Sequence, residues 1–268
     1  MEPFQLKQHT FNVQNDYNKV IGITSRHGGI SPYNEFSLNM ALYIDDEIAN
    51  VHHNQDIVAS EIDFDTTNWV FPIQKHGNRI QLVRPEDKGM NVRALTDQWE
   101  DIDGLYTYHK GILLTMCFAD CVPVYLFSNS DDFIALGHAG WRGTVGMILE
   151  RLIHAYDGDK SQLRVIIGPS VSAPCYEVNE DIKSKFIALN LGLEDCFKSN
   201  DNQMYAINLQ EINRRIAIHA GISPEHITVS KRCTSTENDA FFSYRLEKGK
   251  TGRMLAYIGT RDNHERKR

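Results

Sequence analysis

The segment Met116–Gly143 reads MCFADCVPVYLFSNSDDFIALGHAGWRG and carries the strongest fold signal in the chain. Two apolar runs, Val122–Phe127 and Phe133–Gly137, flank Ser-Asn-Ser-Asp-Asp, a composition typical of a turn. We therefore expect an antiparallel hairpin. Cys121 at the start of the first strand and His138 at the end of the second then lie near the same end of the sheet.

A cysteine and a histidine brought together in this way have three interpretations. They are a nucleophile and its base, two ligands of a metal, or a buried thiol packed near an imidazole. The spacing alone does not choose among these interpretations.

The residues around Cys121 add two expectations about local structure. Neighbouring side chains of an extended strand point to opposite faces, so Asp120 is expected to face away from the partner of Cys121. Pro123 cannot donate a hydrogen bond within a sheet, so we expect its strand to begin at an edge or to carry a bulge.

Outward from this hairpin, short apolar or β-branched runs predict further strands. With the hairpin, the expected strands are Val20–Thr24, Trp69–Ile73, Ile80–Val83, Ile112–Phe118, Val122–Phe127, Phe133–Gly137, Val165–Gly168, Ile227–Ser230 and Met254–Gly259.

Helical spacing of apolar residues predicts three helices. One is capped by Asp45 or Asp46, one follows Gly140, and one runs from Asn208 to Gly221. Many strands, few helices and no regular alternation favour an α+β fold with mixed, largely antiparallel sheets. We expect one domain over residues 1–268, with a charged tail that frays at residues 261–268.

The overall composition is that of a globular protein. Of 268 residues, 41% are hydrophobic and 24% are charged, and the net charge is −7. An acidic chain is a poor electrostatic partner for nucleic acid, so we expect no nucleic-acid binding. The glycine-rich segment Gly137–Gly143 is not a GxGxxG motif, which leaves a dinucleotide site unsupported.

The first residues lack the basic and apolar regions of a signal peptide, and the longest apolar stretch is interrupted by Asp120. Five cysteines without an export signal favour reduced thiols. We therefore expect a cytoplasmic protein that does not contact a membrane, either a monomer or a homodimer.

Two other segments hold candidate binding residues. His76 follows an apolar run and precedes a glycine in Gln74-Lys75-His76-Gly77, a good position for a metal ligand. Arg26 lies in a strand-to-turn segment, Thr24–Gly29, where its guanidinium can meet an anion or remain a surface charge.

Seven motifs in this order resemble one known family across Thr24–Met254. They are TSRHGGIS-PY-SLNM, QKHGNRI, DIDGLYT, FADCVPVYL, GHAGWRGT, IGPSVSAPCYEV and FFSYR-KGKTGRM. The family was first called multicopper polyphenol oxidase, or laccase-like, of the YfiH/YlmD type. Its members were later interpreted as zinc-dependent purine nucleoside phosphorylases. The combination of ADCVP with HAGWRG is highly specific to it.

The resemblance implies a fold and a metal site. The family fold is a four-layer α/β/β/α sandwich. Its three metal ligands correspond here to His76, Cys121 and His138, which are also the implied catalytic residues. Two imidazoles and one thiolate leave a fourth position open, as in catalytic zinc sites. The same ligands also suit copper, so Zn²⁺ is expected and Cu²⁺ is the alternative.

The resemblance also implies an activity. A purine nucleoside phosphorylase joins phosphate to the sugar of adenosine, inosine or guanosine, with methylthioadenosine as a further expected substrate, and releases the free base. Arg26 and Arg245 are our candidates for holding phosphate, and Asn39 for a polar contact to the ligand. The family further implies adenosine deaminase as a side activity, for which a metal lowers the pKa of water.

Three alternative functions remain, one of which is a non-enzymatic partner protein, for instance in cell division or envelope maintenance. A copper-dependent polyphenol oxidase is the older name, but multicopper oxidases build their clusters from His-x-His pairs. This chain has eleven histidines and no such pair. The third alternative is a cysteine or metal hydrolase that acts on an envelope metabolite.

Overall fold

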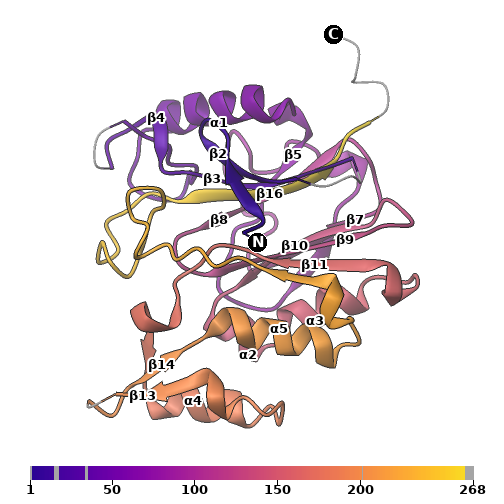
Figure 1. Ribbon diagram of the computed structural model, residues 1–268. Coiled ribbons are helices and arrows are strands. Elements are labelled where there is room, and N and C mark those ends of the chain that lie inside the picture. The colour runs from indigo at the N-terminus through magenta and orange to yellow at the C-terminus, as the bar shows by residue number, and fades with distance from the viewer. Residues whose placement is uncertain (1, 15–17, 34–35, 201, 263–268) are drawn as a thin grey trace.

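The computed structural model describes residues 2–14, 18–33, 36–200 and 202–262. Figure 1 shows four layers: helix α1, two stacked sheets, and a group of helices beneath the second sheet. A small sheet with helix α4 lies beyond these helices. The α+β class and the α/β/β/α sandwich are therefore confirmed.

The first sheet contains both ends of the described chain. Its strand order is β1-β2-β3-β16-β8-β5, and only β5 and β8 run parallel. The strands are β1 (Phe4–Leu6), β2 (Thr10–Val13), β3 (Lys19–Thr24), β16 (Met254–Thr260), β8 (Ile112–Phe118) and β5 (Trp69–Val70). Strand β4 (His27–Ser31) packs against α1.

The second sheet contains the hairpin. Its order is β15-β11-β9-β10-β7-β6, in which the outer pairs β15–β11 and β7–β6 are parallel and the inner pairs antiparallel. The strands are β15 (Ile227–Val229), β11 (Leu163–Ile167), β9 (Val122–Ser128), β10 (Ile134–Ala139), β7 (Gly104–Thr107) and β6 (Ile80–Leu82).

Helices cover the outer faces of both sheets. They are α1 (Ile48–Ile62), α2 (Trp141–Val145), α3 (Ile148–His154), α4 (Glu180–Ile187) and α5 (Leu209–His219). The small sheet has the order β12-β14-β13 and consists of β12 (Glu177–Val178), β14 (Tyr205–Ile207) and β13 (Phe197–Ser199). None of the helices in the described ranges is long and apolar enough to cross a bilayer.

The side chains of each strand alternate between the two faces of its sheet, and this alternation forms the apolar cores between the layers. On β8, Leu113 packs toward the α1 side, whereas Leu114 packs between the two sheets. On β9, Tyr125 faces the space between the sheets and Leu126 faces the helices. Successive side chains of a strand point to opposite faces, so strands buried on both faces separate three apolar cores.

Several boundaries differ from the predicted ones. The Pro123 strand is central rather than at an edge: β9 pairs with both β10 and β11, and Pro123 is only its second residue. The predicted strand Trp69–Ile73 stops at Val70, since Pro72 has no N–H to donate. Helix α1 begins after Glu47, and the Asp46 carboxylate accepts hydrogen bonds from Asn39 and Asn50 instead of capping it.

The predicted helix after Gly140 is two helices. Met147 adopts a left-handed conformation (φ 59°) between α2 and α3, and Asn78 donates to the Gly146 carbonyl at 2.7 Å. The third helix is confirmed: the Asn208 side chain accepts from the Glu211 N–H, and Gly221 follows with φ 97°.

The charged tail is only partly described. Arg261 is held by α1, since its Nη2 donates to the Ile62 carbonyl at 2.6 Å and its Nη1 lies 3.1 Å from an Asp63 carboxylate oxygen. The rest of the tail that we predict to fray, residues 263–268, lies outside the described residues.

Candidate metal centre

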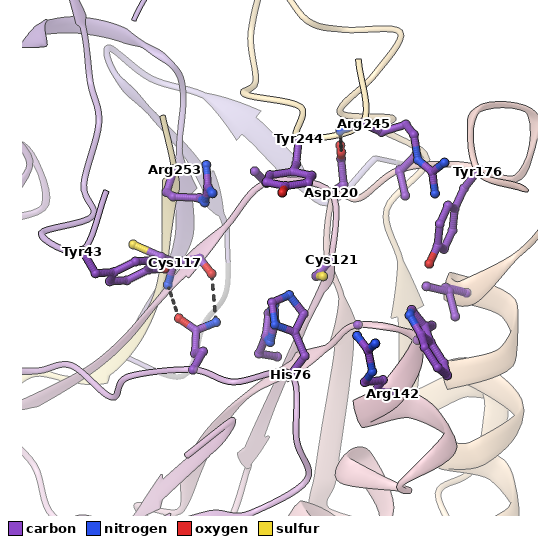
Figure 2. Close-up of a pocket in the computed structure, with 17 residues that line it drawn as sticks. Tyr43, His76, Cys117, Asp120, Cys121, Arg142, Tyr176, Tyr244, Arg245 and Arg253 are labelled. Carbon is purple, nitrogen blue, oxygen red and sulfur yellow. Dashed lines mark hydrogen bonds between the residues drawn. The ribbon is translucent and has the colours of Figure 1, made fainter. Parts of the chain in front are cut away.

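The hairpin brings Cys121 and His138 together as its register requires. Pro123 pairs with His138 and Val122 with Ala139, so Cys121 precedes β9 at the end of the sheet where β10 finishes. His76 joins them from the loop between β5 and β6. One ligand atom from each of the three residues lies within 4.8 Å of the others. Figure 2 shows His76 beside Cys121 in the floor of a cavity.

The backbone of His76 adopts a conformation that is uncommon for a residue with a side chain. Its φ is 62°, in the left-handed region. Asp103 holds this turn, because its carboxylate accepts hydrogen bonds from the N–H groups of Lys75, His76 and Gly77 at 3.2, 3.0 and 2.8 Å. Three backbone donors converging on one buried carboxylate fix where the imidazole points.

The same carboxylate orients the second histidine. Asp103 is fully buried and accepts from Nδ1 of His138 at 2.7 Å. A carboxylate only accepts, so Nδ1 carries the proton and Nε2 is left as the ligand atom. This is the carboxylate–histidine arrangement that orients metal-binding imidazoles.

The pKa values of the pair are strongly coupled. Burial would raise the pKa of the Cys121 thiol, but the imidazoles of His138 and His76 outweigh burial and lower it to about 6. Burial would lower the pKa of His138, but the Cys121 sulfur and Asp103 raise it to about 10. The lowered pKa of Cys121 favours a thiolate at neutral pH, which is the form that binds metals. The raised pKa of His138 keeps the imidazole protonated beside this thiolate, so metal binding would release the Nε2 proton.

These residues fit a zinc or copper ion. Two imidazole nitrogens and one thiolate are a suitable ligand set for either metal. Gly140 leaves room beside them, since a Cβ at this position would lie 2.9 Å from Cys121 Sγ and 3.4 Å from the His76 ring. In the described part of the chain, this is the one group of three or more His, Cys, Asp or Glu side chains positioned to hold a metal.

A cavity of about 480 Å³ opens above the three ligands. Its size lies within the range of roughly 300–1,000 Å³ found for small-molecule sites. Half of the other fourteen lining residues are aromatic or cationic: Tyr43, Trp141, Arg142, Tyr176, Tyr244, Arg245 and Arg253.

Each of the three cavity arginines lies over an aromatic ring. Arg142 is 4.5 Å from the Trp141 ring centre, Arg245 is 4.9 Å from that of Tyr176, and Arg253 is 5.4 Å from that of Tyr244. No ion pair joins any of these guanidinium groups to a carboxylate among the described residues. The three guanidinium groups therefore bring positive charge to the cavity that no ion pair takes up, and Asp120 is the one carboxylate among the residues that line it.

Asp120 acts in the wall of the cavity rather than among the ligands. Its φ is 86°, at the turn between β8 and β9. The carboxylate accepts from the Thr234 hydroxyl and from the Arg245 backbone N–H, both at 2.6 Å. Asp120 thus fixes the backbone of Arg245, as Figure 2 shows.

Arg26 does not reach the cavity, which corrects the expectation that it meets an anion there. It is 5% exposed and pairs with Glu247 at 2.8 Å. Its other nitrogen donates to the carbonyls of Asn238 and Phe241 at 2.7 and 3.3 Å. All of these partners lie in the segment around Tyr244 and Arg245, so Arg26 anchors the loop that carries them.

Asn39 likewise supports the cavity from behind and does not line it. It is fully buried, and its Oδ1 accepts from the Arg253 N–H at 3.0 Å and from the Ala41 N–H at 3.2 Å. Arg245 is the one candidate substrate contact that does line the cavity.

Most of the residues that line or support the cavity around His76, Cys121 and His138 are not predicted from the sequence. Asp103 lies in the motif DIDGLYT and Arg142 in GHAGWRGT, and both motifs were assigned to the family without a role for these side chains. Tyr43 and Arg253 come from segments remote in sequence and meet the site through the first sheet and its loops. The presence of Asp103, Arg142 and Arg253 within family motifs was the available signal, since Arg253 belongs to FFSYR-KGKTGRM.

Curated relatives match nearly the whole chain. A purine nucleoside phosphorylase of Staphylococcus saprophyticus is 44% identical over 260 residues, which covers 96% of this chain and 99% of that protein. A purine nucleoside phosphorylase of Staphylococcus aureus is 46% identical over 239 residues, covering 89% and 90%.

Solved structures agree with the fold, and a family profile agrees with the sequence. The crystal structure of YlmD from Geobacillus stearothermophilus has a TM-score of 0.93 at 36% identity and covers 98% of this chain and 100% of its own. The profile of the family described as multi-copper polyphenol oxidoreductase laccase matches residues 20–261. The chain is therefore a member of this multi-copper polyphenol oxidoreductase laccase family, which is also called the YfiH family.

Proposed function

We propose that the protein is a purine nucleoside phosphorylase whose reaction takes place in the cavity above His76, Cys121 and His138. One observation carries the proposal: three arginines without carboxylate partners surround a cavity with a metal-ligand set in its floor. The names of the relatives agree with this activity. The substrates are adenosine, inosine, guanosine or methylthioadenosine, together with phosphate.

His76, Cys121 and His138 would hold one zinc ion, with copper as the alternative. When bound, the metal supplies Lewis acidity that polarises a ligand oxygen or nitrogen in the cavity. Asp103 keeps both imidazoles in their ligand orientation, and the low pKa of Cys121 keeps its sulfur anionic at neutral pH.

We assign the phosphate to the end of the cavity that contains Arg142 and Arg245. Arg245 lies over the Tyr176 ring at 4.9 Å, and Arg142 lies on the same side of Cys121 as Tyr176 in Figure 2. Arginine holds a phosphate with two parallel hydrogen bonds. Arg253 is a weaker candidate because its Nη1 donates to the carbonyls of Thr251 and Gly252 at 2.7 and 2.9 Å.

The purine then occupies the end that contains Tyr43, Tyr244 and Arg253. In Figure 2, Tyr43 and Arg253 lie on one side of Cys121, and Arg142 and Tyr176 lie on the other. Aromatic faces at this end suit a planar base. The sugar between the two ends places C1′ between phosphate and base.

The reaction transfers one glycosyl group. An oxygen of hydrogen phosphate forms a bond to C1′ while the bond from C1′ to the purine nitrogen breaks. The purine leaves with the electron pair and gains the proton that hydrogen phosphate loses on becoming ribose 1-phosphate. The arginines stabilise the phosphate without moving a proton, because guanidinium stays charged. We also propose deamination of adenosine as a side reaction in the same cavity, with water in place of phosphate as the second substrate.

Two other functions have an observation in their favour. The family description points to copper-dependent phenol oxidation. A single three-ligand group among the described residues argues for one metal ion and therefore for weak oxidase activity only. The anionic sulfur of Cys121 beside His138 also resembles the dyad of a cysteine hydrolase.

Arginine variants test the assignment of the phosphate site. Losing one charged contact costs about 1.5–3 kcal/mol, so Arg142→Ala and Arg245→Ala should each lower phosphorolysis of inosine by roughly 10- to 150-fold. Arg84→Ala, at an exposed arginine outside the cavity, is the matched control and should retain activity. Adenosine deamination uses no phosphate and should be spared in both cavity variants. If Arg142→Ala and Arg245→Ala both phosphorolyse inosine at the wild-type rate, the assignment of the phosphate site is wrong.

A further inference from the structure

A second sulfur cluster lies next to the cavity and takes no part in the metal centre. Cys233 follows β15 and forms a parallel bridge with Ser170. Its Sγ accepts two hydrogen bonds from Ser172, from the hydroxyl at 3.0 Å and from the backbone N–H at 3.3 Å. Two donors aimed at one sulfur stabilise its anionic form.

The pKa of Cys233 follows from these contacts. Burial would raise the pKa of this thiol, but the hydrogen bonds from Ser172 and Thr236 lower it to about 7. A thiol with this pKa is substantially thiolate at neutral pH, and the thiolate is the nucleophile in cysteine oxidation.

Cys175 supplies a second thiol beside the first. It ends a short 3-10 turn, Ala173–Cys175, in which its N–H donates to the Ser172 carbonyl at 2.9 Å. The turn returns Cys175 to the same Ser172 that contacts Cys233. Burial and the interaction with the Cys233 sulfur raise the pKa of the Cys175 thiol. Cys233 is 5% exposed, whereas Cys175 is half-buried. The turn is therefore the side from which a small oxidant reaches the pair.

We propose that Cys175 and Cys233 are a redox-active pair that a hydroperoxide converts to a disulfide. The Cys233 thiolate attacks one peroxide oxygen, the O–O bond breaks, and the leaving oxygen takes a proton. The Cys233 sulfur is then a sulfenic acid. The Cys175 thiol loses its proton, attacks that sulfur and displaces hydroxide, which leaves as water. The peroxide is reduced by two electrons, which the two thiols supply.

The pair belongs to a closed ring of contacts in the cavity wall. Thr234, next to Cys233, donates to Asp120, and Asp120 accepts from the Arg245 N–H. The Arg245 guanidinium lies over the Tyr176 ring, and Tyr176 follows Cys175 in sequence. Formation of the disulfide moves the sulfurs of Cys175 and Cys233 together and thereby strains this ring of contacts at both cysteines. It therefore displaces Arg245 and Tyr176 relative to each other.

The expected functional effect rests on the proposed phosphate site. Oxidation should raise the KM for phosphate several-fold and leave the zinc content unchanged, because none of the three metal ligands belongs to the ring. The disulfide itself is detected by mass, so its formation is judged without reference to any activity.

The test treats the zinc-loaded full chain with a small excess of hydrogen peroxide. Intact mass should fall by about 2 Da as two thiol hydrogens are lost, and peptide mapping should join Cys175 to Cys233. Dithiothreitol should reverse the change. Cys175→Ser and Cys233→Ser should each abolish the cross-link. Cys196→Ala is the matched control, because Cys196 packs in the core around β13, and it should leave the cross-link intact.

Three results would overturn the proposal. The first is oxidation of Cys233 to a sulfinic acid without any cross-link, and the second is a cross-link that survives Cys175→Ser. The third is an unchanged phosphate KM in the fully cross-linked protein, which would remove the connection to the cavity. If the reduced protein cleaves no nucleoside at all, the proposed function fails, and the mass measurement still decides the thiol pair.

Discussion

The Asp103 carboxylate accepts a hydrogen bond from Nδ1 of His138 at 2.7 Å and another from the backbone N–H of His76 at 3.0 Å. One fully buried side chain thus holds the imidazole of His138 and the backbone of His76, two of the three residues that we propose as metal ligands, although they are 62 positions apart in the chain. Its pKa is lowered despite burial, which would raise it, because His138 and the backbone donors of Lys75 and Gly77 stabilise the carboxylate.

Asp103→Asn should weaken metal binding while the fold survives. The amide is the same size but a poorer acceptor, and loss of such a supporting contact typically costs about 10- to 100-fold in metal affinity. Competition with a chelator measures the affinity, and circular dichroism checks the fold. Asp101→Asn is the matched control, because Asp101 is exposed and two residues away. Equal zinc affinity in both variants would contradict the role of Asp103.

Gly140→Ala should disturb the metal centre more than it disturbs stability. The φ of Gly140 is −67°, a value that alanine adopts freely, so its backbone is not strained. The added Cβ would instead lie 2.9 Å from Cys121 Sγ, closer than packed atoms approach. We expect zinc per chain to fall several-fold with a Tm close to wild type. Full zinc occupancy would show that the sulfur has room to move.

Glu247→Gln should reduce stability at neutral pH and do so less in acid. Burial would raise the pKa of Glu247, but hydrogen bonds from Thr251, Arg26 and the Ser243 backbone lower it below its ordinary value of 4.5. A lowered folded-state pKa contributes stability above the unfolded-state pKa, and the contribution is lost as pH falls through the folded-state value. Removing it costs about 1.5–3 kcal/mol, the scale of a hydrogen bond to a charged group.

Urea unfolding at pH 7 and at roughly pH 3.5 checks this pH dependence. The difference between wild type and Glu247→Gln should be largest at pH 7 and should shrink in acid. Glu86→Gln, at an exposed glutamate, should stay close to wild type at both values. A constant difference between Glu247→Gln and wild type would mean that the carboxylate charge contributes nothing.

The sequence predicts strand bounds best where apolar runs are long, although the short strands β6 (Ile80–Leu82) and β15 (Ile227–Val229) are predicted as well. Strand β8 (Ile112–Phe118) has the predicted bounds, and β9 and β10 differ by one or two residues at their ends. Strands such as β7 (Gly104–Thr107) and β12 (Glu177–Val178) are two to four residues long, and they pair with residues 24 to 33 positions away in the chain. Local pattern cannot reveal such strands, because their stability comes from tertiary packing.

The candidate site also has a part that the sequence predicts and a part that it does not. Cys121 and His138 are adjacent because a hairpin register makes them so, and that register is readable from the sequence. Arg26 was expected to bind an anion, but its charge is neutralised by Glu247, 221 positions away. Arg253 lines the cavity, although it was assigned no role. Which arginine faces a ligand depends on where carboxylates lie in space. Sequence spacing does not predict these positions.

The most direct test of the proposed function is the phosphate requirement of nucleoside cleavage. The zinc-loaded protein is incubated with inosine, with and without phosphate, and the sugar product is identified. We predict that cleavage requires phosphate and yields ribose 1-phosphate and free hypoxanthine in equal amounts, and that Cys121→Ala abolishes it. Free ribose formed without phosphate, or no cleavage of any purine nucleoside by the zinc-loaded protein, would contradict the account.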